Sequence, residues 1–324
     1  VLAATPDPKK SRFFTIDKDY PASLQMVLEP LLLFDAVFVE DRPIVELISP
    51  SFAYQSDFLQ DWYTSDLKPP AIEPTEIIEK NRANEEKRKA LEATIKATEE
   101  ELSSFHSKEY IAAVKSLSAG EATYSQSTFG FSEDGDNPVF SGMYDAYLWS
   151  TGASLTGLEL LLNQEANIVF NPAGGLHHAM QNYASGFCVF NDPVIAIKQL
   201  LKLGLRAAYV DIDCHHGDGV QHAFYDTDAV LNISIHESGA FLFPGTGSTD
   251  EVGSGKGRNY SVNIPLYPYT MDSTYFWAFE STVLPLLDTF KPDVLVSQLG
   301  IDTHFSDPIT HLCLTVQGFS KIIE

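Results

Sequence analysis

The stretch Arg206–Gly219 reads RAAYVDIDCHHGDG, an apolar segment that runs directly into a series of polar side chains. Its first part, Arg206–Asp213, has the composition of a buried strand. Asp211, Asp213 and His215 are spaced two residues apart, so an extended backbone directs them to one face. An isolated Asp-x-His pair would more often be a turn feature. Clustered charges at a buried strand end are costly unless paired or bound to metal, so we predict a metal-binding cluster here.

A third metal ligand has to come from elsewhere in the chain, and Asp302 is the best candidate. It lies in Gly300–His304, which reads GIDTH and follows the apolar run Val294–Leu299. Three protein ligands leave one coordination position open for water or substrate, which is typical of a catalytic metal site. A carboxylate-rich site of this kind accommodates Fe(II).

A pair of adjacent histidines follows a glycine-rich turn. The segment Gly174–Ala179 reads GGLHHA and contains His177 and His178. Histidine titrates near neutral pH, so two of them supply a general base and a general acid. Each needs a carboxylate to fix its tautomer, and Asp211 and Asp218 are available for this. A histidine pair alone is weak support, because packed or exposed histidines are commoner.

Strand-like and helix-like segments alternate in the second half of the chain. The expected strands are Ala166–Asn171, Arg206–Asp213, Ala229–His236 and Val294–Leu299, and the expected helices are Asp192–Leu203, Val220–Tyr225, Met271–Phe290 (with a kink at Pro285) and Gln317–Glu324. This alternation predicts an α/β fold of three layers, α/β/α, with a mainly parallel central sheet. Binding sites in such sheets form at the carboxyl ends of the strands, where the polar motifs lie.

The N-terminal third carries weaker signals. We expect residues 1–35 to form an extension or irregular segment, and residues 36–324 to form one domain. Within that domain we expect short strands at Ala36–Glu40 and Ile44–Ser49, a loop at Ser65–Pro74, and a helix from Thr75 to about Ser104. The helix is indicated by the spacing of its apolar residues and by its i,i+4 Glu–Lys pairs.

The composition argues against nucleic-acid-binding, membrane-spanning and disulfide-stabilised classes of protein. The 324 residues carry a net charge of -23, so the surface repels phosphate backbones and direct nucleic-acid binding is not expected. No run of about 18 apolar residues occurs, so no membrane span is expected. The three cysteines, Cys188, Cys214 and Cys313, form no obvious disulfide framework. With no secretion signal in the printed sequence, we expect a cytoplasmic protein.

Several motifs together resemble the histone deacetylase family and occur in the family's order. They are GGLHHA at 174–179, ASGFC at 184–188, Asn191-Asp192, DIDCHHGDG at 211–219, FPGTG at 243–247 and QLGIDT at 298–303. The strong similarity covers about Phe105 to Ile323. Other short words look closest to the bacterial acetoin-utilisation branch, among them His236-Glu-Ser-Gly and Ser306-Asp-Pro-Ile-Thr-His-Leu.

The resemblance implies an arginase/deacetylase-like fold, zinc-dependent hydrolysis of acetyl-lysine amides on proteins, and acetylated protein or peptide substrates. It implies that Asp213, His215 and Asp302 bind zinc. It also implies catalytic roles for His177 and His178, backed by Asp211 and Asp218. The implied substrate-binding residues are Asp136, Gly186, Phe187 and Phe243. A structural potassium ion is implied at Asp211, Asp213, His215, Ser234 and Ile235.

The chain departs from the family pattern in two places. The family places a catalytic Tyr in a glycine-rich turn downstream of the third ligand, but the last Tyr here is Tyr275. We expect the domain to be truncated at its C-terminal end, and loss of this oxyanion donor to cost on the order of 10²–10³ in rate. The family's N-terminal His-Pro element is absent too.

Three alternatives stay open. An acetylpolyamine amidohydrolase would keep the fold and change the substrate. An arginase-like ureohydrolase with two manganese ions would need more aspartates than Gly300–His304 supplies. A non-catalytic module that binds acyl-lysine would lack the catalytic Tyr and show binding without turnover.

Overall fold

The computed structural model describes residues 13–16, 53–56 and 95–324, and the chain divides into two units, Val1–Lys87 and Arg88–Glu324. In the first unit, strands β1 (Phe13–Ile16) and β2 (Ala53–Ser56) pair in parallel. β1 lies within residues 1–35, for which an extension or irregular segment was predicted. The predictions for residues 36–49 and 65–74, and for the domain boundary after residue 35, lie outside the described residues.

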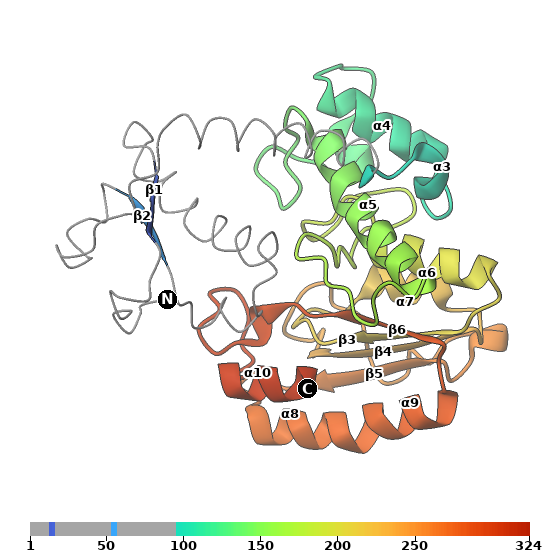
Figure 1. The fold of residues 1–324 in the computed structure, drawn as a ribbon, viewed down its shortest axis with the longest axis vertical. Coiled ribbons are helices and arrows are strands. Elements are labelled where there is room, and N and C mark those ends of the chain that lie inside the picture. The colour runs from blue at the N-terminus through green and yellow to red at the C-terminus, as the bar shows by residue number, and fades with distance from the viewer. Residues whose placement is uncertain (1–12, 17–52, 57–94) are drawn as a thin grey trace. The chain divides into compact units, whose positions relative to one another are not determined.

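The second unit is built on a sheet of four parallel strands (Figure 1). Its order is β5 (Ser261–Leu266), β4 (Val230–Glu237), β3 (Ala207–Asp211) and β6 (Val294–Gln298). Every residue of β3 and β4 is buried, as the apolar runs in the sequence predict. β5 was not predicted, because Asn263 and Pro265 interrupt its apolar pattern.

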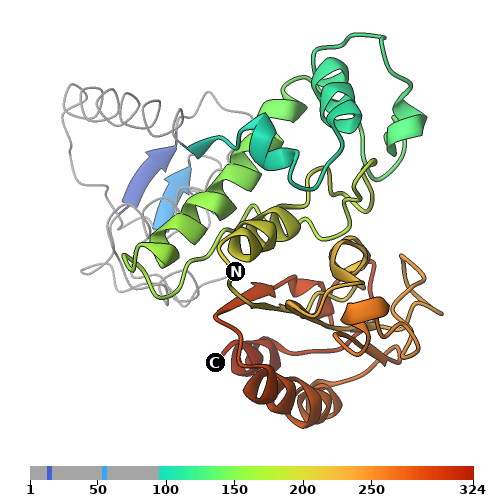
Figure 2. The ribbon, with the colours of Figure 1, turned by 90° about the vertical axis from the view of Figure 1, so that its right-hand side faces the viewer.

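Helices cover both faces of this sheet and confirm the predicted three-layer α/β/α architecture (Figures 1 and 2). On one side of β3, Ala207 and Tyr209 belong to a core shared with α4–α7; on the other, Ala208 and Val210 belong to a core shared with α8–α10. The helices of the first layer are α4 (Lys108–Ser118), α5 (Met143–Leu162), α6 (Asp192–Lys202) and α7 (Asp218–Phe224), and those of the second are α8 (Asp272–Ala278), α9 (Leu284–Phe290) and α10 (Val316–Ile323).

Helix α6 shows how local sequence sets the element bounds. Asn191 caps its N-terminus by accepting a hydrogen bond from the Val194 N–H at 3.1 Å, and Pro193 occupies the first turn. Gly204, just beyond the C-terminus, adopts φ 76°, a conformation that glycine tolerates best. These signals lie in the sequence itself, so the helix was predicted within one residue of its end.

Two predicted elements are wrong. Residues 166–171 form no strand and pair with none of the described strands, and Ile168 is 87% exposed. In the described part of the helix predicted from Thr75 to Ser104, the helix breaks at residues 96–98. Thr98 there caps the short helix α3 (Glu99–Leu102) through a capping box with Glu101.

A continuous helical run over 272–290 confirms the predicted helix Met271–Phe290, and its hydrogen-bond pattern changes near the predicted kink. A π-helical turn, Phe279–Val283, separates α8 from α9, immediately before Pro285. Proline has no N–H to donate to the preceding turn, so a change in the hydrogen-bond pattern is expected there. Among the described residues, no helix combines the length and apolar character that crossing a bilayer requires.

Candidate functional site

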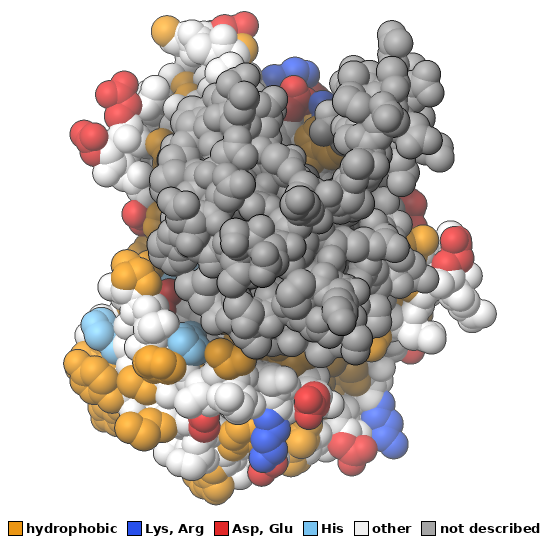
Figure 3. Space-filling view, turned by 60° about the vertical axis from the view of Figure 1, so that its left-hand side comes forward, with side chains coloured by type: hydrophobic (Ala, Val, Ile, Leu, Met, Phe, Trp, Pro, Cys, Tyr) orange, Lys and Arg blue, Asp and Glu red, His pale blue; other side chains and the backbone are white. Residues whose placement is uncertain are grey.

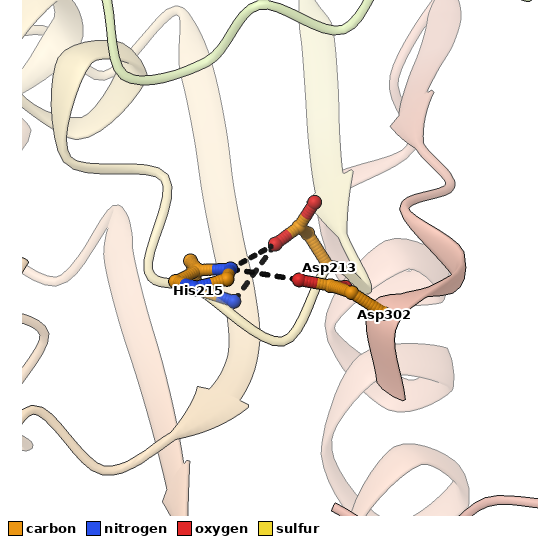
Figure 4. A group of neighbouring side chains, drawn as sticks. All are labelled: Asp213, His215 and Asp302. Carbon is orange, nitrogen blue, oxygen red and sulfur yellow. Dashed lines mark hydrogen bonds and ion pairs between the residues drawn. The ribbon is translucent and has the colours of Figure 1, made fainter. Parts of the chain in front are cut away.

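The three predicted metal ligands meet at the carboxyl edge of the sheet (Figure 4). Asp213 and His215 follow the end of β3, and Asp302 lies in the 3₁₀ turn Ile301–Thr303 that follows β6. Because β3 and β6 are hydrogen-bonded neighbours, their carboxyl ends bring residues about 90 positions apart in sequence to one place. The structure thus joins the two segments that sequence spacing alone left separate.

The side chains of this cluster point toward one another. His215 Nδ1 lies 2.7 Å from Asp302 Oδ2 and 3.1 Å from Asp213 Oδ1. One donor atom from each residue lies within 4.8 Å of the others, so the set fits a single cation. Two carboxylates and one imidazole are ligands that Zn²⁺ and Fe(II) accept. Both the distances and the types of donor atom in this cluster are therefore compatible with a bound metal ion.

The electrostatics of the cluster favour positive charge. Burial lowers the pKa of His215, but hydrogen bonds to Asp213 and Asp302 outweigh burial and raise it to about 10. Burial raises the pKa of Asp302 to about 6, against the hydrogen bond from His215. The two acids are thus held close together in a partly buried place, where a cation relieves their repulsion.

Neighbouring groups orient each ligand. Gln298, the last residue of β6, donates from Nε2 to Asp213 Oδ2 at 3.0 Å. The Cys214 N–H donates to Asp302 Oδ1 at 2.8 Å. At Gly300, a Cβ atom would overlap Asp213 Oδ2, so glycine is required for this approach. Sequence reasoning gave Gln298 no role, although it stands in the same motif as Asp302.

The tandem histidines lie beside this cluster and are backed as predicted. His177 Nδ1 lies 2.7 Å from Asp211 Oδ2, and His178 Nδ1 lies 2.7 Å from Asp218 Oδ1. The two imidazole centroids are 4.0 Å apart. His177 Nε2 lies 3.9 Å from Asp213 Oδ1, which places the pair next to the metal ligands.

The surroundings shift the pKa values of the two histidines in opposite directions. Burial lowers the pKa of His177, but Asp211 and Asp213 outweigh burial and raise it to about 9. For His178, burial and the neighbouring His177 lower the pKa by more than Asp218 raises it, so the pKa falls below its ordinary value. The two rings therefore differ in their affinity for a proton, which suits a proton donor and a proton acceptor side by side.

The start of helix α6 holds the histidine loop in place. The Asp192 carboxylate accepts hydrogen bonds from the backbone N–H groups of Gly175 and Leu176, at 3.1 and 2.9 Å. Asn191 Nδ2 donates to the carbonyls of His177 and Ala179, at 3.1 and 3.0 Å. Sequence reasoning quoted Asn191-Asp192 as a motif without a function. The sequence signal that could have indicated a role is that these two polar residues stand at a helix N-terminus, directly before an apolar run.

The Phe243 side chain lies against His178. The Phe243 ring packs edge-on against the His178 ring, with centroids 5.1 Å apart. Gly186 has φ 48°, and a Cβ atom there would lie 2.8 Å from the Phe243 ring. Phe187 is 59% exposed, so nothing described buries it as ordinary core. A cavity of about 480 Å³ adjoins this wall and is lined by Tyr183, Ser185, Asp218 and Phe243, among others.

Asp136 is an exposed side chain. It lies exposed in the turn after Phe131, and it makes no hydrogen bond or ion pair with the described metal ligands or tandem histidines. Its role as a substrate-gripping acid stays a prediction. Ser234 and Ile235 lie in β4, where Ser234 pairs in register with Asp211, and the potassium site also stays a prediction. Cys188 and Cys214 are buried and free.

Comparison with known proteins identifies relatives that match most of this chain. The model of the histone deacetylase domain family matches residues 71–324. The acetoin utilization protein AcuC of Bacillus subtilis (strain 168) is 43% identical over 228 residues, which are 70% of this chain and 59% of that protein. Human histone deacetylase 1 is 41% identical over 230 residues, 71% of this chain and 48% of that protein.

Solved structures give the same result. An HDAC homologue from Aquifex aeolicus matches with a TM-score of 0.66 and 36% identity, over 70% of this chain and 62% of that chain. An HDAC homologue complexed with SAHA matches with a TM-score of 0.67 and the same identity and coverage. This chain thus spans less than two thirds of the length of these relatives.

Proposed function

The chain belongs to the histone deacetylase family, and on that basis we propose that it is a zinc-dependent amidohydrolase that removes acetyl groups from lysine side chains of proteins. The observation that carries the proposal is the convergence of Asp213, His215 and Asp302 next to two histidines of unequal pKa. Amide hydrolysis needs an electrophilic centre, a base for water and an acid for the leaving amine.

In this proposal, Asp213, His215 and Asp302 hold the cation, which supplies a Lewis acid that polarises the acetyl carbonyl and lowers the pKa of the attacking water. His178 is the neutral ring and accepts the proton from the water at Nε2, because its Nδ1 faces Asp218. His177 is the charged ring and favours the developing negative charge near Asp213.

The leaving lysine nitrogen then needs a proton, which the tandem-histidine site returns. Asp211 keeps His177 oriented and is itself buried completely, with Tyr209 Oη and the Asp213 N–H as its other donors. Phe187 and Phe243 exclude water around a neutral acyl chain. An unacylated lysine would bring an unpaired charge into this apolar approach, which is costly.

The test is turnover by the 324-residue chain loaded with zinc, measured on an acetyl-lysine peptide and on an acetylated polyamine at equal concentration. We expect hydrolysis of the peptide, and loss of both activity and bound zinc in Asp213→Ala. Preferential turnover of the polyamine would instead support the amidohydrolase alternative. Tight peptide binding with no turnover would support the acyl-lysine-binding alternative.

A further inference from the structure

Glu237 is a buried carboxylate that the proposed mechanism does not use. It is the last residue of β4, and its side chain is completely buried. A buried charge of this kind persists only when hydrogen bonds compensate for its lost hydration. Its location at the carboxyl end of a central strand places it at the same edge of the sheet as the metal ligands.

His311 supplies that compensation from a different loop. The His311 backbone N–H donates to Glu237 Oε2 at 2.9 Å, and the His311 ring Nδ1 lies 3.0 Å from Glu237 Oε1. A carboxylate oxygen accepts hydrogen bonds, so the tautomer with the hydrogen on Nδ1 suits this contact. Cys214 Sγ is a weaker third donor at 3.8 Å. One residue thus grips both oxygens of the carboxylate and fixes its own loop to β4.

Two routes lead from this grip to the third metal ligand. In the first, the Glu237 N–H donates to the Cys214 carbonyl at 2.8 Å, and the N–H of the same Cys214 donates to Asp302 Oδ1 at 2.8 Å. In the second, Thr310, which precedes His311, donates from its hydroxyl to the Asp302 carbonyl. The side chain and the backbone of Asp302 are therefore both tied to the Glu237–His311 pair.

We propose that Glu237 and His311 form a clamp that positions Asp302 for metal binding, with Thr310 as the link from His311 to Asp302. The proposal rests on the assignment of Asp302 as a metal ligand. The clamp residues fall in two of the short words, His236-Glu-Ser-Gly and Ser306–Leu312, through which the sequence resembles the acetoin-utilisation branch. The function proposed above leaves the Glu237–His311 contact unexplained, and the clamp gives it a role.

The physical basis is the cost of a misplaced ligand. Asp302 lies in a short 3₁₀ turn, and the chain that follows it up to α10 is held only by isolated bridges, such as the one between His304 and Leu314. Groups that orient metal ligands through hydrogen bonds typically change metal affinity by about 10–100-fold when they are removed. Loss of the clamp should therefore weaken metal binding without removing any ligand.

The clamp is tested on the full 324-residue chain by zinc affinity, measured in competition with a chromophoric chelator. The absorption spectrum of bound Co²⁺ reports ligand geometry in the same samples. Glu237→Gln, His311→Ala and Thr310→Val are expected to bind zinc about 10–100-fold more weakly and to shift the Co²⁺ spectrum. Thr310→Ser keeps the hydroxyl, and His304→Ala removes a ring of the same loop that bonds only Ser306. Both controls are expected to match the unsubstituted chain.

His311→Ala leaves the buried Glu237 without its main hydrogen-bond donors and can therefore fail to fold. Thr310→Val keeps the volume of the side chain, so in that case it tests whether the clamp affects zinc binding. The clamp is overturned if folded Thr310→Val and Glu237→Gln bind zinc with unchanged affinity and an unchanged Co²⁺ spectrum. Absence of zinc binding by the unsubstituted chain would overturn the proposed function, and the clamp with it. Normal binding by that chain and by every variant would overturn the clamp alone.

Discussion

His177 donates from Nδ1 to Asp211 Oδ2 across 2.7 Å, and both side chains are almost completely buried. Asp211 raises the pKa of His177 against the effect of burial, and the contact leaves the ring Nε2 directed toward Asp213. The tandem-histidine site therefore depends on a carboxylate that touches neither metal nor substrate in the proposed mechanism.

Asp211→Asn preserves the shape of the side chain and removes its charge. We expect turnover of an acetyl-lysine peptide to fall on the order of 10²-fold, because His177 loses the charge that holds its proton. The measurement is kcat/KM at saturating zinc. Asp145→Asn, which removes an exposed acid paired with Lys96, is the control and should have no effect. Equal activity in Asp211→Asn would contradict the assigned role.

Gly186→Ala should damage the site more than the fold. Gly186 has φ 48° and leaves no room for a Cβ atom between His178 and Phe243. Gly204 also has positive φ, at 76°, but open space around it. Each alanine is expected to cost roughly 1–2 kcal/mol of stability through its backbone conformation. Only Gly186→Ala should also abolish peptide turnover; a similar loss in Gly204→Ala would show that destabilisation alone explains the effect.

Phe187→Ala tests the aromatic approach to the site. Because Phe187 is 59% exposed, its loss should change the free energy of unfolding by less than about 0.5 kcal/mol. Peptide affinity should weaken by about 10-fold, since a large apolar contact area is removed from the acyl chain. Trp277→Ala, which removes a ring 69% exposed on α8, is the matched control for surface loss. Unchanged peptide affinity in Phe187→Ala would remove this residue from the site.

Acid sensitivity should depend on a histidine outside the site. His106 accepts a hydrogen bond from the Asn191 N–H at 2.9 Å, and burial lowers its pKa to about 3. Below pH 6.5 the unfolded chain therefore binds a proton that the folded chain excludes, and the free energy of unfolding falls as pH falls. Between pH 7.5 and pH 5 this loss amounts to about 2 kcal/mol.

Urea unfolding at the two pH values measures this effect. His106→Gln should be less stable at pH 7.5 and should lose about 2 kcal/mol less on acidification. His222→Gln, which replaces an exposed histidine of α7, should keep the full pH dependence. An identical pH dependence in His106→Gln and the unsubstituted chain would rule out His106 as its source.

Much of the fold could be predicted because its signals are local. The apolar runs of β3, β4 and β6 and the caps of α6 are visible in the sequence. β5 was missed because its polar residues find partners only in the folded chain: Asn263 donates to Gln221 at 2.7 Å. Residues 166–171 have strand-like composition, but composition does not reveal whether a neighbouring strand is available to pair with them.

Some residues of the candidate site could likewise be predicted from the sequence, and others could not. The spacing of Asp211, Asp213 and His215 at the end of an apolar strand predicted a cluster with Asp302 as its third ligand, and the structure brings Asp213, His215 and Asp302 together. Gln298 and Glu237 were missed because their roles follow from which strands are neighbours, and single-sequence patterns do not give that order. On one face of the molecule, histidine side chains lie exposed among hydrophobic ones (Figure 3), an arrangement that single-sequence patterns likewise do not give.

The central claim is that one cation is held between the ends of β3 and β6. The direct measurement is anomalous diffraction at the zinc absorption edge, on crystals of the chain grown with zinc. We predict a single strong peak within bonding distance of Asp213, His215 and Asp302. A zinc peak elsewhere, with no density among these three side chains, would contradict the account.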